Sequence, residues 1–96
     1  MIVEFSKRAT ADLQKIAVDS HSFGERVAKA VEARIREIIT HIAEYPEAGI
    51  RIAERPSMRM IPLGRFPYEI LYRVSEDRIR ILPIRHRSRR SWTKER

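Results

Sequence analysis

The chain has 96 residues, of which 43% are hydrophobic and 34% are charged, so residues 1–96 suffice for one globular domain and are too few for two. It contains no cysteine, which excludes a disulfide scaffold, a thiolate zinc site and a cysteine nucleophile. The chain has no long apolar run and no visible secretory signal, so we expect a cytoplasmic protein without a membrane contact, and its net charge of +7 favours an anionic partner.

The first half of the chain predicts a short strand followed by a helix. Residues 2–5 alternate apolar and polar side chains, which is the period of a strand. Ser6 is placed to cap the helix that follows. The apolar stripe of this helix consists of Ala9, Leu13, Ile16 and Ala17, and residues 21–24 end it.

A second helix is predicted to begin near Phe23. Ser22 and Glu25 have the spacing of a capping box, in which both side chains accept free backbone amides. The apolar stripe of this helix is formed by Val27, Val31, Ile35, Ile38 and Ile42. Pro46 ends the helix, because proline disfavours helical geometry in the residue before it. The short break predicts an antiparallel helical hairpin.

After the helices the apolar period changes from 3.6 to 2, which predicts strands. Residues 46–56, with two prolines and a glycine, are expected to form a loop. Three strands follow at residues 58–61, 66–74 and 78–85, with turns at residues 62–65 and 75–77, and residues 87–96 form a basic tail. The order is β-α-α-β-β-β, so we expect an α+β fold in which the helical hairpin packs on a small, mainly antiparallel sheet.

The last predicted strand changes phase along its length. Ile79 and Ile81 share one face of it. Leu82 and Ile84 fall on the other face. Two explanations fit this pattern, namely a β-bulge at Pro83 or a strand that is covered on both sides.

The positive charge is concentrated in the second half of the chain. Residues 1–50 carry a net charge of −1 and residues 51–96 a net charge of +8, mostly from arginine. Arginine matches phosphate and carboxylate groups through a planar fork of donors. Arginines that face away from the helices are expected to form one basic surface on the sheet. That surface either binds a nucleic acid or an acidic protein, or only keeps the domain soluble.

Three aromatic residues lie among these arginines. Tyr68, Tyr72 and Trp92 have rings that can stack on unpaired bases. The alternation of the strand places both tyrosines on one face with Ile70 and Val74, which favours a place for them in the core.

His86 ends the last predicted strand among arginines. It is either a general acid or base for phosphodiester cleavage or a structural histidine that finishes the strand. Glu54, near the predicted loop, is either a partner in that chemistry or a solvated carboxylate. The three histidines are not spaced as metal ligands, and no phosphate-binding, dinucleotide-binding or serine-hydrolase motif is present, so we predict no metal and no cofactor.

Four stretches of the chain occur in a recognisable order. They are Tyr-Pro-Glu-Ala-Gly at residues 45–49, Met-Arg-Met-Ile at 58–61, Phe-Pro-Tyr-Glu-Ile-Leu-Tyr-Arg-Val at 66–74, and Ile-Arg-His-Arg-Ser-Arg-Arg at 84–90. This set resembles the RelE/ParE toxin superfamily, and the resemblance covers nearly the whole chain. It implies a growth-inhibiting toxin of a type II toxin–antitoxin module, of the kind linked to plasmid stabilisation and held inactive by a small antitoxin.

One branch of that superfamily cuts messenger RNA on the ribosome. In this branch the resemblance gives catalytic roles to Glu54 and His86, with Arg87 at the last catalytic position. Two positions depart from the pattern. Glu69 stands where the branch has a catalytic arginine, and Arg87 stands where it has a terminal tyrosine. A carboxylate at the first position repels a phosphate, which argues against an enzyme of this kind.

The other branch, ParE, acts by binding, and its known target is DNA gyrase. The resemblance to this branch rests on the Pro-Tyr-x-Ile-x-Tyr strand and makes a gyrase poison the favoured hypothesis, with the ribosome-dependent endoribonuclease as the alternative. The residues expected on the toxic surface are Arg59, Arg65, His86, Arg87, Arg89, Arg90 and Trp92.

The resemblance also implies a partner, a ParD-like antitoxin with an acidic segment that folds onto the toxin. We expect it to contact the helical hairpin around Leu13, Ile16 and Ile39, and arginines at the edge of a strand. Operator DNA is expected to be bound only by the complex of the two proteins.

Overall fold

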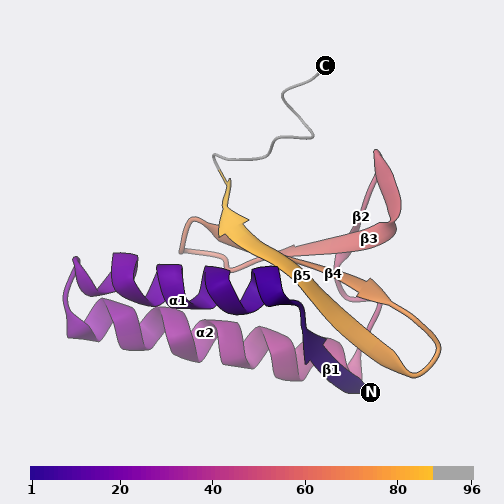
Figure 1. Ribbon diagram of the computed structural model, residues 1–96, viewed down its shortest axis with the longest axis horizontal. Helices are drawn as coiled ribbons and strands as arrows, with labels where there is room; N and C mark the ends of the chain where they lie inside the picture. Colours follow the sequence, from indigo (N-terminus) through magenta and orange to yellow (C-terminus); the bar gives the residue numbers. More distant parts are fainter. Residues whose placement is uncertain (88–96) are drawn as a thin grey trace.

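The computed structural model describes residues 1–87 as two helices and five strands (Figure 1). The elements are β1 (Ile2–Phe5), α1 (Lys7–His21), α2 (Glu25–Glu44), β2 (Ile50–Ile52), β3 (Arg55–Pro62), β4 (Tyr68–Val74) and β5 (Arg78–His86). The two helices lie side by side and form the hairpin that the sequence predicts. Within these residues no helix is both long enough and apolar enough to cross a membrane.

The sheet has the strand order β1-β5-β4-β3-β2. Strand β1 runs parallel to β5, and the other neighbouring strands are antiparallel. The predicted α+β class, with a helical hairpin on a mainly antiparallel sheet, is therefore confirmed.

The sheet contains one strand more than predicted. The expectation of a loop over residues 46–56 is wrong from Ile50 onward, because β2 pairs with β3 through Ile50 and Met60 and through Arg51 and Arg59. Pro56 is tolerated in β3 because it lies outside the residue pairs of both ladders, where its missing N–H is not needed. The Ile-Arg-Ile alternation of β2 covers only three residues, which is too short to distinguish a strand from a loop in the sequence.

The sequence predicts the N-cap of α1 correctly but not the N-cap of α2. The Ser6 hydroxyl oxygen accepts the amide of Ala9 at 3.0 Å, as expected for an N-cap. The prediction of a capping box at Ser22 is wrong, because the N-cap of α2 is Gly24. The Ser22 hydroxyl instead donates to the carbonyl of Asp19 at 2.6 Å and closes α1. The second helix is preceded by Gly24, whose φ of 104° requires glycine.

A β-bulge explains the phase change in β5. Ile70 pairs with Ile84 and Tyr72 with Ile81, so Leu82 and Pro83 together stand opposite Leu71 alone. The extra residue returns Ile84 to the face of Ile79 and Ile81, and all three join the core under the helices. Of the two explanations that the sequence left open, the bulge is the one that the structure contains.

The core is divided between the two faces of the sheet. The larger cluster lies between the helices and the sheet and includes Ile16, Ile35, Ile42, Ile70, Tyr72 and Ile81. A smaller cluster of Ile52, Met58 and Leu71 lies on the face without helices, with Met60 and Leu82 packed against it. The core position predicted for Tyr72 is confirmed, and Tyr68 packs half-buried against the same cluster.

The buried hydroxyl of Tyr72 fixes the connection between α2 and β2. It donates to the carbonyl of Pro46 at 2.9 Å and accepts the amide of Gly49 at 2.8 Å. Arg59, the cross-strand partner of Tyr72, donates to the carbonyl of Gly49 at 2.8 Å. A Cβ at Gly49 would lie 2.6 Å from the Tyr72 hydroxyl oxygen, so this close approach requires glycine. Burial raises the pKa of Tyr72, which keeps the hydroxyl available as a donor.

Tyr72→Phe removes both hydrogen bonds and leaves the buried amide of Gly49 unpaired. We expect the free energy of unfolding to fall by about 1–3 kcal/mol, measured by urea denaturation. Tyr45→Phe is the matched control, because Tyr45 is exposed, and should change stability by less than about 0.5 kcal/mol. Equal stabilities for the two variants would contradict the structural role of Tyr72.

Candidate functional site

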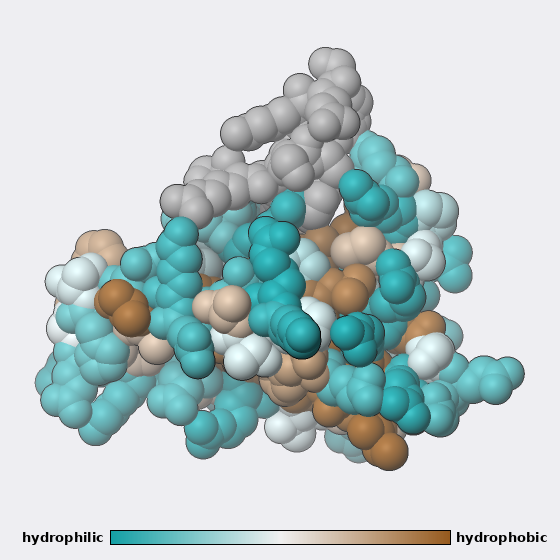
Figure 2. Space-filling view, in the orientation of Figure 1, coloured by the Kyte–Doolittle hydropathy of each residue, from teal (hydrophilic) through white to brown (hydrophobic). Residues whose placement is uncertain are grey.

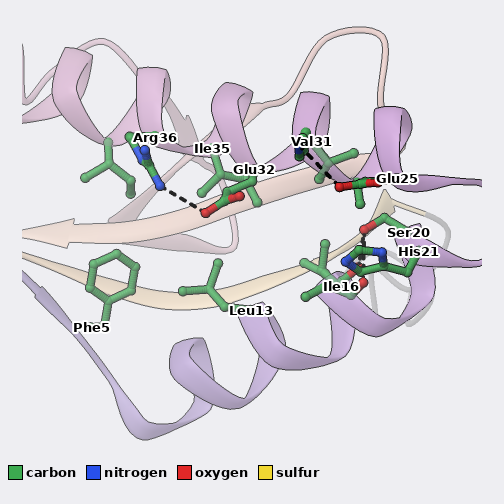
Figure 3. A pocket seen from close by; sticks show the side chains of 14 residues that line it. Phe5, Leu13, Ile16, Ser20, His21, Glu25, Val31, Glu32, Ile35 and Arg36 are labelled. Atoms are coloured by element: carbon green, nitrogen blue, oxygen red, sulfur yellow. Dashed lines mark hydrogen bonds and ion pairs between the residues drawn. The ribbon is translucent and has the colours of Figure 1, made fainter.

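A groove of about 540 Å³ runs between α1 and α2 (Figure 3). Leu13 and Ile16 of α1 face Val31 and Ile35 of α2, because the apolar stripes of both helices are wider than the contact between them. Phe5, at the end of β1, lies at one end of the groove. The groove is therefore an apolar channel along the helical hairpin.

The charged side chains along the α2 rim of the groove are paired with one another. Lys29 Nζ lies 3.3 Å from Glu25 Oε2, and Arg36 Nη2 lies 2.9 Å from Glu32 Oε2. Both are exposed pairs one helical turn apart, which contribute little to stability. They leave this rim without a net charge, so the groove offers mainly apolar contact.

The apolar surface continues from the groove onto β1. Phe5 is 40% exposed and Ile2 is 63% exposed. Figure 2 shows hydrophobic side chains gathered at the lower right, over β1, on a face that is otherwise mostly hydrophilic. The groove and the exposed side chains of β1 thus form one continuous apolar surface.

The structure brings together the three residues predicted to contact an antitoxin. Leu13, Ile16 and Ile39 all line the groove. The sequence assigned Val31 and Ile35 only to the core stripe, although both also form the floor of the groove, and it gave no role to Phe5. Helical periodicity identifies apolar faces, but only the packing of the two helices shows which part of each face stays open.

The helix-free face of the sheet carries arginines at both ends of its apolar cluster. Arg80 of β5 pairs with Arg73 of β4 across the ladder, and Arg73 pairs in turn with Met58 of β3. Glu4, beside them on β1, lies 2.6 Å from Arg78 Nη1 and 3.5 Å from Arg80 Nη1. Much of the basic charge predicted for this face is therefore balanced by a carboxylate of β1.

The predicted toxic-surface residues of the described chain come from several elements, and the amide of Arg87 donates to the carbonyl of Pro67 at 2.9 Å beside the turn that carries Arg65. Arg59 lies on the helix side of β3, where it binds the loop before β2. Arg65 lies on the β3–β4 turn, with its guanidinium 5.3 Å from the centre of the Phe66 ring. His86 ends β5 in a cleft beside α1. Arg87 follows it, and Arg89, Arg90 and Trp92 lie outside the described residues.

Glu69 is fully buried on the helix-free face. Its Oε2 atom lies 3.8 Å from Nε of Arg85, its cross-strand neighbour, which is also largely buried. A carboxylate in this position requires a cation, because an unpaired buried charge is strongly unfavourable. The residue that departs from the ribonuclease pattern thus binds one of the arginines of the same face.

The residues assigned to ribonuclease chemistry lie on different elements. Glu54 lies in the turn between β2 and β3, whereas His86 ends β5 and its ring packs edge-on against Tyr68 at 5.6 Å. Strands β3 and β4 separate β2 from β5, a span of about 14 Å at about 4.8 Å per strand. The sheet therefore does not place Glu54 beside His86. Within residues 1–87 no group of three acidic, histidine or cysteine side chains is placed to hold a metal ion.

Comparison with known proteins shows the class of protein to which the chain belongs. The E. coli RelE toxin shares the fold with a TM-score of 0.66 at 18% identity, over 98% of this chain and 92% of that one. A family model for the ParE toxin of the type II toxin–antitoxin system parDE matches residues 3–91. The chain belongs to this ParE toxin family and is a type II toxin of the RelE/ParE superfamily.

Two relatives place the chain within the superfamily. The toxin RelE2 of Caulobacter vibrioides is 32% identical over 87 residues, which cover 91% of this chain and 96% of that one. A chain of the chromosomal ParDE toxin–antitoxin system from P. aeruginosa is 27% identical, with a TM-score of 0.63 over 90% of this chain and 95% of that one. Toxins of both names are thus similar to this chain over most of its length.

Removal of the Glu69 carboxylate should destabilise the fold. In Glu69→Ala, Arg85 loses a buried partner, and we expect a loss of about 3 kcal/mol in the free energy of unfolding. Glu76→Ala, at an exposed position, is the control and should change stability by less than about 0.5 kcal/mol. Urea unfolding of both variants measures the difference, and a Glu69→Ala protein as stable as the control would refute the pairing.

Proposed function

We propose that this chain is a ParE-like toxin that poisons DNA gyrase in the cytoplasm and is neutralised by a cognate ParD-like antitoxin. Membership of the ParE family supports the toxin class, and the similarity to a ParDE system supports the antitoxin partner. The antitoxin complex, and not the toxin alone, is proposed to bind operator DNA. In this proposal the toxin is a poison that acts by binding.

The observation that carries this choice of target is the buried carboxylate of Glu69. A nuclease must stabilise the negative charge that develops on a phosphate in the transition state. Glu69 carries the opposite charge, and it lies 3.8 Å from Arg85. Because the guanidinium of Arg85 is paired with Glu69, this pair offers no positive charge to a phosphate. A binding function is therefore favoured over phosphodiester cleavage.

The second candidate is a RelE-like, ribosome-dependent mRNA endoribonuclease. The specific observation in its favour is the position of His86, whose ring packs against Tyr68 in a cleft lined by the basic residues Arg8, Lys15 and Arg85 and by the carboxylates Asp12 and Asp19. A histidine among basic side chains is suited to proton transfer near a phosphate. In this candidate Glu54, His86 and Arg87 carry the reaction.

The first experiment incubates purified toxin with DNA gyrase and supercoiled plasmid and measures linear DNA on a gel. We expect linear DNA with the toxin and none when excess antitoxin is added. The Glu54→Ala and His86→Ala variants give the contrast with the second candidate. If gyrase is unaffected and mRNA is cleaved on ribosomes, with cleavage lost in these variants, the ribonuclease replaces the gyrase poison.

The groove between α1 and α2 is proposed as the antitoxin site. Leu13→Asp places a charge on its apolar wall, and a side chain of this size contributes about 1.5–3 kcal/mol when it is buried. We therefore expect antitoxin affinity to fall by about tenfold or more, measured by titration calorimetry. Gln14→Asp, at the next, exposed residue of the same helix, is the control. Equal affinity of both variants would exclude the groove.

A further inference from the structure

A row of apolar side chains crosses the face of the sheet that has no helices. Ile50 of β2 pairs with Met60 of β3, and Met60 pairs with Leu71 of β4. Leu82 of β5 stands opposite Leu71 at the bulge. Paired residues on neighbouring strands point to the same face, and Met60 and Leu82 pack against the small cluster that contains Leu71. These four residues, one from each of four adjacent strands, form a cross-strand stripe.

Part of the cross-strand stripe is open to solvent. Leu71 is fully buried, Met60 and Leu82 are half-buried, and Ile50 is 65% exposed. Removal of a large aliphatic side chain from water favours association, and methionine adapts its shape to the surface that it contacts. The stripe therefore has a fixed, buried centre and accessible apolar side chains around it.

Arginines border one side of the stripe. Arg73 follows Leu71 by two residues on the same face of β4, and Arg80 of β5 is its cross-strand partner. Both arginines are exposed. Nη1 of Arg80 lies 3.5 Å from Oε1 of Glu4, whereas Arg73 forms no ion pair within residues 1–87. Like charges in directly opposite positions repel each other, so a carboxylate bound beside Arg73 would relieve that repulsion.

The other side of the stripe offers no such charge. Glu69 precedes Leu71 by two residues on β4, and its carboxylate is fully buried beside the guanidinium of Arg85. This ion pair is internal to the sheet. The exposed positive charge next to the stripe is therefore that of Arg73 and Arg80.

Within residues 1–87 the helix-free face carries no aromatic ring. The rings lie on the helix side of the sheet or beside the helices, namely Phe5, Phe23, Tyr45, Phe66, Tyr68 and Tyr72. Proteins recognise unpaired bases largely by stacking them on such rings. An apolar centre with a polar rim, in which arginine is frequent, is instead typical of an interface with another protein.

We propose that the cross-strand stripe, with Arg73 and Arg80 at its rim, binds the toxin's protein target at an apolar patch bordered by carboxylates. This inference rests on the proposed function, in which the target is gyrase, and it supplies the contact residues of that poison. None of them is among the residues that the sequence favoured for the toxic surface. The stripe lies on the helix-free face and the groove lies between the helices, so target and antitoxin are assigned to different surfaces.

The test uses the full chain and two matched pairs of variants. Ile50→Asp places a charge at the exposed end of the stripe, and Val18→Asp makes the same change on α1, where Val18 is 71% exposed. Arg73→Glu reverses a charge at the rim, and Arg26→Glu does so at an exposed position of α2. We expect each stripe or rim variant to lower the affinity for purified DNA gyrase, measured by surface plasmon resonance, by about tenfold or more. Each helical control should change it by less than about twofold.

Two further measurements separate loss of the contact from loss of the fold. Growth inhibition, measured on expression of each variant without antitoxin, should fall in Ile50→Asp and Arg73→Glu and persist in the two controls. Antitoxin affinity, measured by titration calorimetry, should change by less than about twofold in all four variants, because the groove is a separate surface. Thermal unfolding verifies that each variant is folded.

Four results would overturn the proposal. The first is equal gyrase binding and equal growth inhibition in Ile50→Asp and Val18→Asp. The second is a loss of antitoxin affinity in the stripe variants as large as their loss of gyrase affinity, which would assign the stripe to the antitoxin. The third is a dimer of the free toxin that Ile50→Asp converts to a monomer in sedimentation, which would assign it to a second copy of the chain. The fourth is weaker RNA or DNA binding in Arg73→Glu without any effect of Ile50→Asp, which would assign the face to a nucleic acid.

Failure of this inference and failure of the proposed function give different results. If all four variants poison gyrase as well as the unaltered toxin does, the target surface is wrong and the gyrase poison stands. If the unaltered toxin has no effect on gyrase, but growth inhibition is lost in Ile50→Asp and Arg73→Glu and kept in the controls, the gyrase target is wrong and the surface stands.

Discussion

The extra residue at Leu82–Pro83 determines how β5 serves both faces of the sheet. It turns Ile84 back toward the helices, while Leu82 packs into the small cluster on the other face. The amide of Ile84 binds Oδ2 of Asp12 at 3.0 Å, so α1 is held against the strand where the bulge interrupts the ladder. The position of α1, and with it one wall of the groove, depends on this irregularity.

The distribution of carboxylates matters as much as the distribution of arginines. Glu4 is distant in sequence from Arg78 and Arg80, yet the parallel pairing of β1 with β5 places it between them. The pairing of β4 with β5 likewise places Glu69 beside Arg85. Within residues 1–87 the arginines of the basic half therefore do not form a uniformly basic surface.

The motifs that resemble the toxin superfamily are explained largely by structure. Gly49 must be small because the Tyr72 hydroxyl approaches it, and Arg59 holds the same loop through backbone carbonyls. These residues support the connection from α2 to β2 and do not form a catalytic cluster.

The sequence by itself determined the α+β class and the two helices with their apolar faces, which include Leu13 and Ile16 on α1 and Ile39 on α2, because burial of one helical face imposes a local period. It also limited the phase change in β5 to two explanations. Only the tertiary structure decided that β2 is a strand, that Glu4 and Glu69 balance distant arginines, and that the sheet separates Glu54, in the β2–β3 turn, from His86 at the end of β5. These features depend on contacts between different elements, which the local period of the chain does not report.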